Sequence, residues 1–306
     1  MFLEQGILPQ NYFFKYIAGS FIIIVASLVG QLPMIAVLYF EASKENENFP
    51  SSNEAMMHFL SPNTTLFLLL LSFVFALLVF FIVVKVLHKQ TILSVTSSRS
   101  QVDWGRVFFS FSLWSVFGIA STFIDWFLNP QNFTLNFDLF PFLILLVIAV
   151  VFIPIQTTTE EYIFRGYLMQ GFANLSLNKW FPLLMTSSIF GLMHLANPEV
   201  VKMGSSIMIY YIGTGFFLGI ITLMDEGMEL ALGFHASNNL IGALLVTSNW
   251  SVFQTHSILK DVSEPSVLYD VLIPVGLIYP ILLLIFGRKY HWTHWKKKLT
   301  GTIDKI

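Results

Sequence analysis

The sequence has few charged residues. Of its 306 residues, 11% are Asp, Glu, Lys or Arg and 55% are hydrophobic, whereas a soluble globular chain is about one quarter charged. Such a composition indicates a polytopic membrane protein with membrane lipid as its surroundings. The formal net charge is only -2, and no basic arm or patch indicates a nucleic-acid partner.

The sequence also contains no cysteine. This absence excludes disulfide bonds, thiolate metal sites and a cysteine nucleophile. The N-terminus lacks the pattern of a cleaved signal peptide, which has an apolar region of about 7–15 residues. The apolar run 13–39 is longer than that, and we interpret it as a retained membrane anchor.

Long apolar runs are what the sequence does have. A membrane-spanning helix needs about 20 mainly apolar residues, and helices satisfy their own backbone hydrogen bonds in lipid. We therefore predict an all-α bundle of about eight transmembrane helices. The predicted spans are 13–40, 64–88, 107–128, 139–157, 181–196, 205–224, 229–247 and 267–287. Glycines within the sixth of these, Gly213, Gly215 and Gly219, are typical of close helix packing.

The distribution of Lys and Arg predicts the orientation in the membrane. The loop after the second span contains Lys89, Arg99 and Arg106, and the C-terminal tail is also basic. The loops 41–63 and 129–138 are poor in Lys and Arg. Because short cytoplasmic loops are rich in these residues, we expect both termini in the cytoplasm. We expect the polar loop 41–63 to face outward without a fold of its own.

Polar side chains inside apolar runs are costly and mark candidates for function. Three groups qualify. The first group is Glu160, Glu161 and Arg165, the second is His194 alone, and the third is His235 and Asn239. Asp125, beside Trp126 at the end of a span, is more typical of the membrane interface. The remaining histidines lie in loops or at span ends, where we expect solvated or headgroup-facing side chains, and they are His58, His88, His256, His291 and His294.

Helical spacing separates the members of the first group. Glu161 and Arg165 are four residues apart on one face, with the acid first, which is the favourable order for an ion pair. Glu160 is rotated by about 100° from Glu161 and is left less neutralised. An apolar pocket disfavours its ionised form, which suits Glu160 to exchange protons near neutral pH. The alternative is that all three residues mark the cytoplasmic end of a span.

The third group suggests a site for a developing negative charge. His235 and Asn239 are four residues apart and face the same way, so both can donate hydrogen bonds to one oxygen. The alternative is interhelical packing by polar side chains. Asn238 is a rival for the same role, but it points to another side of the helix. His194 alone is more often structural, although beside a carboxylate it could hold or activate a water.

These groups resemble the motifs of the CPBP family, the CAAX proteases and bacteriocin-processing enzymes, which are also called the Abi family of intramembrane proteases. The family pattern is EExxxR, FxxxH and HxxxN on three successive membrane helices. The chain has "EEYIFR" at 160–165, "FGLMH" at 190–194 and "HASNN" at 235–239, in that order. The resemblance covers about residues 140–250.

The resemblance implies a glutamate-dependent intramembrane endopeptidase in a bacterial cell membrane, with a peptide or protein substrate. It implies that Glu160 activates a water that His194 helps to hold, and that His235 and Asn239 form the oxyanion site. Glu161 and Arg165 would brace the site. It does not specify a prenylated substrate. We expect no cofactor, although a divalent metal such as Zn on Glu160, His194 and His235 stays open as an alternative.

Depth in the membrane is a difficulty for this interpretation. If the fourth span ended near residue 157, Glu160 would lie at the surface, whereas His194 would lie roughly 20 Å deep at about 1.5 Å per residue. We therefore expect the fourth helix to continue past Glu160 and Gly166 toward Ala173, which would bury Glu160 in the bundle.

The chain divides into an N-terminal part, 1–130, with three spans, a catalytic core, 131–250, with four, and a C-terminal part, 251–306. Two functions of other classes compete with a peptidase. A proton-coupled transporter also uses intramembrane Glu, His and Arg, but no inverted repeat is visible. A non-catalytic membrane scaffold could carry the same motifs.

Overall fold

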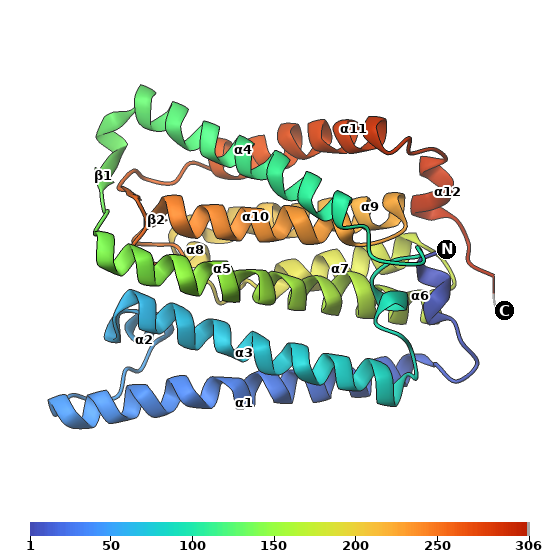
Figure 1. Ribbon diagram of the computed structural model, residues 1–306, viewed down its shortest axis with the longest axis horizontal. Coiled ribbons are helices and arrows are strands. Elements are labelled where there is room, and N and C mark those ends of the chain that lie inside the picture. The colour runs from blue at the N-terminus through green and yellow to red at the C-terminus, as the bar shows by residue number, and fades with distance from the viewer. Residues whose placement is uncertain (305–306) are drawn as a thin grey trace.

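Helices running back and forth along one direction form nearly the whole molecule (Figure 1). The computed structural model describes residues 1–304 of the chain. Its α-helices are α1 (Phe13–Glu45), α2 (Asn53–Phe59), α3 (Pro62–Ile82), α4 (Trp104–Leu128), α5 (Leu139–Glu161), α6 (Met169–Ser176), α7 (Trp180–Leu192), α8 (Pro198–Met203), α9 (Ile207–Asp225), α10 (Glu229–Leu245), α11 (Tyr279–Lys289) and α12 (Trp295–Thr300). Both labelled termini lie at the same end of the bundle, as an even number of traverses requires.

Six helical stretches within residues 1–304 are long and apolar enough to cross a membrane. They are Phe13–Glu45, Pro62–Leu87, Trp104–Leu128, Leu139–Ser176, Pro198–Asp225 and Val267–Lys289. The prediction of an all-α polytopic membrane protein is therefore confirmed, and the chain is an integral membrane protein.

The predicted number of eight spans is not confirmed, although all eight predicted runs are largely helical. The two predicted spans that are too short to be among the six are α7, with 13 residues, and α10, with 17 residues. At about 1.5 Å per residue, α7 is roughly 20 Å long, which is less than a hydrocarbon core of about 30 Å. Turns at 193–196 and a β-strand from Val246 end these two helices early.

The fourth apolar stretch continues far past residue 157, as expected. A π-helical segment, Tyr162–Leu168, joins α5 to α6 without a break in the helix Leu139–Ser176. Glu160 therefore lies about 16 residues, or roughly 24 Å, from the end of this helix. Single π-helical turns inside α-helices occur frequently at functional sites.

Close packing brings α10 between α4 and α5, and α7 against α9. Gly233 of α10 allows this approach, because a Cβ atom there would clash with the backbone oxygen of Val107 on α4. Gly215 of α9 similarly lies against the backbone of Ser187 on α7, where a Cβ atom would meet the Ser187 oxygen at 2.7 Å. The expectation of close packing at this glycine is confirmed.

Two elements at the end of the bundle opposite the termini were not expected. The loop 41–63 contains α2, which starts where the Ser52 hydroxyl accepts a hydrogen bond from the Ala55 N–H at 3.1 Å. The loop 41–63 therefore contains one short helix that was not predicted. Loops also form a small sheet in the order β1–β3–β2, made of Phe133–Leu135, Leu259–Asp261 and Val246–Ser248.

His88 is completely buried, so the expectation of a solvated or headgroup-facing side chain was wrong for this residue. Its Nδ1 lies 3.1 Å from the Asn11 side-chain oxygen and its Nε2 lies 2.7 Å from the Tyr167 hydroxyl. The N-terminal segment folds back over the end of the second span and encloses the ring. His58, His291 and His294 are exposed, and so is Asp125.

Candidate active site

The three predicted groups come together inside the bundle. Glu160 and Glu161 lie at the end of α5, His194 lies in the turn that follows α7, and His235 and Asn239 lie on α10. The helix Leu139–Ser176 contacts both α7 and α10 through its central part. Polar residues that are far apart in the sequence therefore face one small region.

Glu161, Arg165 and His235 form a buried ion cluster. Arg165 Nη1 donates to Glu161 Oε1 at 3.1 Å, and both side chains are fully buried. His235 Nδ1 lies 2.7 Å from the same carboxylate oxygen. Arg165 also donates to the Gly215 carbonyl at 3.3 Å, and its guanidinium lies 4.4 Å from the Phe190 ring centre. The predicted Glu161–Arg165 pair is thus confirmed, and His235 is its third member.

Glu160 stands apart from the arginine, as the spacing predicts, but it is not without partners. Its Oε1 accepts a hydrogen bond from Gln156 Nε2 at 2.6 Å. Its Oε2 lies 3.5 Å from Nε2 of His235. With 15% of its side chain exposed, Glu160 is the more accessible of the two neighbouring glutamates.

The His194 ring is fixed from two sides. Its Nδ1 donates to the Phe190 carbonyl oxygen at 2.8 Å, and its ring stacks on Tyr211 with centroids 4.3 Å apart. Because Nδ1 carries the hydrogen, Nε2 of the neutral ring is an acceptor. The Phe190 ring lies 4.9 Å from the His194 ring and 6.1 Å from the His235 ring, measured between centroids, so both histidines border one aromatic side chain.

Asn239 faces Gln156 across the interface of α10 and α5. Its Nδ2 donates to Gln156 Oε1 at 3.1 Å. Asn238, which the sequence suggests as a rival, instead donates to Asn239 Oδ1 at 3.0 Å and accepts from the Trp114 indole at 3.1 Å. Asn238 therefore supports Asn239 from the side facing α4.

Sequence reasoning missed Gln156 and Tyr211 as members of the site. Gln156 is 94% buried (6% exposed) and bonds to both Glu160 and Asn239. It lies four residues before Glu160 within an apolar run, and this spacing on one helical face was the signal that could have identified it. Tyr211 carries no comparable sequence signal, because an aromatic residue in an apolar helix is usually a packing residue.

A second charged cluster lies at the end of the bundle where the termini are. Arg99 contacts Asp225 at 2.8 Å and Glu229 at 2.9 Å, and Arg106 contacts Asp225 at 3.0 Å. Both acids are buried. Arg99 and Arg106, which contribute to the basic character of the loop after the second span, therefore also attach that loop to the turn between α9 and α10.

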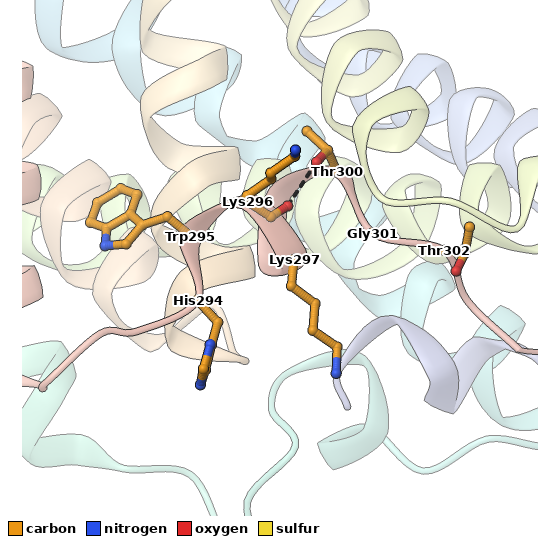
Figure 2. A pocket seen from close by; sticks show the side chains of 7 residues that line it. All are labelled: His294, Trp295, Lys296, Lys297, Thr300, Gly301 and Thr302. Atoms are coloured by element: carbon orange, nitrogen blue, oxygen red, sulfur yellow. Dashed lines mark hydrogen bonds between the residues drawn. The ribbon is translucent and has the colours of Figure 1, made fainter.

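Two surface hollows of the described part of the chain are lined by residues other than the predicted ones. An open hollow of about 690 Å³ lies around α12 (Figure 2). It is lined by His294, Trp295, Lys296, Lys297, Thr300, Gly301 and Thr302. In the part of the chain that the structure describes, no group of three or more His, Asp or Glu side chains has the arrangement of a metal site.

Comparison with known proteins supports the resemblance seen in the motifs. Residues 139–241 match the family described as "Type II CAAX prenyl endopeptidase Rce1-like". This segment contains all six predicted site residues. The chain is also similar to the "Uncharacterized protein YyaK" of Bacillus subtilis (strain 168), with 27% identity over 291 residues that cover 94% of this chain and 95% of the relative. No solved structure has significant similarity to the chain.

Proposed function

We propose that this membrane protein, whose residues 139–241 match the Rce1-like endopeptidase family, is an intramembrane endopeptidase that uses Glu160 to activate water. The observation that carries the proposal is the position of the Glu160 carboxylate, 3.5 Å from Nε2 of His235 on a different helix. A general base and a hydrogen-bond donor that face one small region can activate a water and receive the oxyanion that forms.

The proposed reaction proceeds through a tetrahedral intermediate. Glu160 takes a proton from water while the water oxygen bonds to the carbonyl carbon of the substrate peptide. His235 and Asn239 donate hydrogen bonds to the resulting oxyanion, and His194 Nε2 accepts from the attacking water. Collapse of the intermediate breaks the C–N bond, and Glu160 returns its proton to the leaving amine.

The contacts of His235 constrain its protonation state in this mechanism. Nδ1 faces a carboxylate oxygen of Glu161 at 2.7 Å, and such an oxygen only accepts. Nδ1 therefore carries a hydrogen, and Nε2 can donate to an oxyanion only from the protonated ring. The positive charges of His235 and Arg165 would then balance the negative charges of Glu160 and Glu161. This gives Glu161 and Arg165 the bracing role inferred from the sequence.

The proposed setting is a bacterial cell membrane with both termini in the cytoplasm, and the proposed substrate is a membrane-associated peptide or protein. The family description names prenyl endopeptidases, and a prenylated substrate is one class to assay. The other class to assay consists of membrane-spanning peptides that carry no lipid.

Replacement of Glu160 by Gln tests the proposal. Purified Glu160→Gln protein should remain folded and lose peptide cleavage by about 10²–10⁴-fold, because the amide cannot take the proton from water. Glu45→Gln, at an exposed position of α1, is the matched control and should cleave at the wild-type rate. Comparative proteomics of membrane fractions from wild-type and Glu160→Gln cells should reveal the uncut substrate. Full activity of Glu160→Gln would refute the role of this residue.

Chelation tests the alternative of a required metal. A water-activating carboxylate predicts that EDTA or phenanthroline leaves cleavage unchanged. Loss of cleavage on chelation that Zn²⁺ restores would instead favour a metal-bound water held by Glu160, His194 and His235.

A further inference from the structure

Four hydrogen bonds link Trp114 of α4 to the proposed base. Trp114 Nε1 donates to Asn238 Oδ1 at 3.1 Å, and Asn238 Nδ2 donates to Asn239 Oδ1 at 3.0 Å. Asn239 Nδ2 donates to Gln156 Oε1 at 3.1 Å, and Gln156 Nε2 donates to Glu160 Oε1 at 2.6 Å. We call these five residues the amide chain. It joins the helices α4, α10 and α5.

The direction of donation in the amide chain is determined by its two ends. The indole N–H of Trp114 can only donate, and an ionised carboxylate can only accept. Each amide between them has one acceptor oxygen and one donor nitrogen, so all must point the same way for every bond to form. Rotation of any one amide by 180° would place two oxygens or two N–H groups against each other.

We propose that Trp114 and Gln156 are positioning residues, because the amide chain holds the Gln156 amide with its N–H toward Glu160 and its oxygen toward Asn239. This inference rests on the proposed function for its kinetic consequence. Without the chain, the Gln156 amide could rotate and present its oxygen to the carboxylate. The orientation also leaves Asn239 with a second amide hydrogen for the oxyanion, because only one of its two hydrogens is used by Gln156.

The expected consequence is that the Glu160 carboxylate is held in one orientation. Gln156 donates to its Oε1 at 2.6 Å, and a hydrogen bond to a charged group is among the strong ones. Substitution of Gln156 removes this donor and leaves Glu161, Arg165, His194 and His235 unchanged.

Infrared difference spectroscopy at one fixed pH measures the hydrogen bonding of the Glu160 carboxylate without turnover. The protein is labelled with ¹³C-glutamate, and the spectrum of Glu160→Gln protein is subtracted to isolate one carboxylate group. In Gln156→Met protein the carboxylate stretching band of Glu160 should shift, because its donor is lost. The kcat should fall by about ten- to hundredfold, the change expected for loss of a hydrogen bond to a charged group, with KM little changed.

Trp114→Phe is the second variant, because Phe keeps an aromatic ring beside Phe117 and Phe234 but has no N–H donor. It should shift the Glu160 band in the same direction by a smaller amount. The double variant should match Gln156→Met alone, because Trp114 acts on Glu160 through Gln156.

Two control variants match these changes outside the amide chain. Trp126→Phe removes an exposed indole from the same helix α4, and Gln170→Met removes a buried amide from the same long helix. Gln170 donates to the backbone oxygens of Phe2 and Ser94 instead. Both controls should leave the Glu160 band and kcat unchanged.

The outcomes separate this inference from the proposed function. An unchanged Glu160 carboxylate band in folded Gln156→Met and Trp114→Phe proteins would overturn the inference, whatever the activity. A shifted band in a protein that cleaves no peptide would support the inference and count against the proposed function. If Gln156→Met does not fold, as judged by thermal melting, Trp114→Phe decides alone.

Discussion

Replacement of Arg165 by Met is the perturbation with the largest expected effect on stability. Arg165 and Glu161 are both completely buried and are paired at 3.1 Å. The substitution preserves most of the aliphatic volume but leaves the Glu161 carboxylate with His235 as its only ion-pair partner among residues 1–304. Its Oε2 already has no hydrogen-bond partner among residues 1–304. Without Arg165, the proposed balance of Glu160 and Glu161 against His235 and Arg165 would leave one negative charge in excess inside the bundle.

The expected loss follows from the cost of breaking a buried ion pair, which is about 3–5 kcal/mol when one partner is removed. A chain of this size changes its melting temperature by about 2–4 °C per kcal/mol. Arg165→Met should therefore lower the apparent melting temperature in detergent by about 6–20 °C. Scanning fluorimetry at one fixed heating rate measures this change.

Two further variants identify the cause of the loss. Glu161→Gln combined with Arg165→Met removes both charges, so it should recover at least half of the lost melting temperature. Arg288→Met, at an exposed arginine, should stay within about 0.5 kcal/mol of wild type. A single Arg165→Met protein that melts with the wild type, or a double variant no more stable than the single one, would refute the reasoning.

The remaining predictions concern pH and packing. Burial, with a smaller effect of Lys15, lowers the pKa of His88 from 6.5 to about 4. Between these two pH values the unfolded chain therefore binds a proton at His88 that the folded chain does not bind. Stability should fall as the pH drops from 6.5 toward 4, and the melting temperature of His88→Gln should depend less on pH there; equal pH dependence would contradict this. Gly233→Ala should lower the melting temperature, because its Cβ would clash with the backbone oxygen of Val107. Gly242→Ala on the same helix meets nothing within 4 Å and should raise it slightly; a loss equal to that of Gly233→Ala would refute the packing argument.

Local spacing was enough to predict the Glu161–Arg165 pair and the separation of Glu160 from it. Both depend on one turn of one helix, whose geometry is the same in almost any fold. The continuation of the fourth helix past Glu160 was likewise predictable, because a surface position for Glu160 could not be reconciled with the depth of His194.

The partners of these residues could not be predicted in the same way. Nothing in the sequence indicates that His235 bonds to Glu161, 74 residues earlier, or that Gln156 lies between Glu160 and Asn239. His88 was wrongly expected at the surface, because its burial depends on an N-terminal segment folding back over it.

The sequence by itself determined that this is a helical membrane protein and that three polar motifs on separate helices are its candidate site. Composition and short-range spacing are sufficient for both conclusions, because lipid permits few backbone structures and a helix has one periodicity. Only the tertiary structure decided which donor meets which acceptor. A hydrogen bond tolerates only a few tenths of an ångström, and that precision arises from the packing of α4, α5 and α10 against one another.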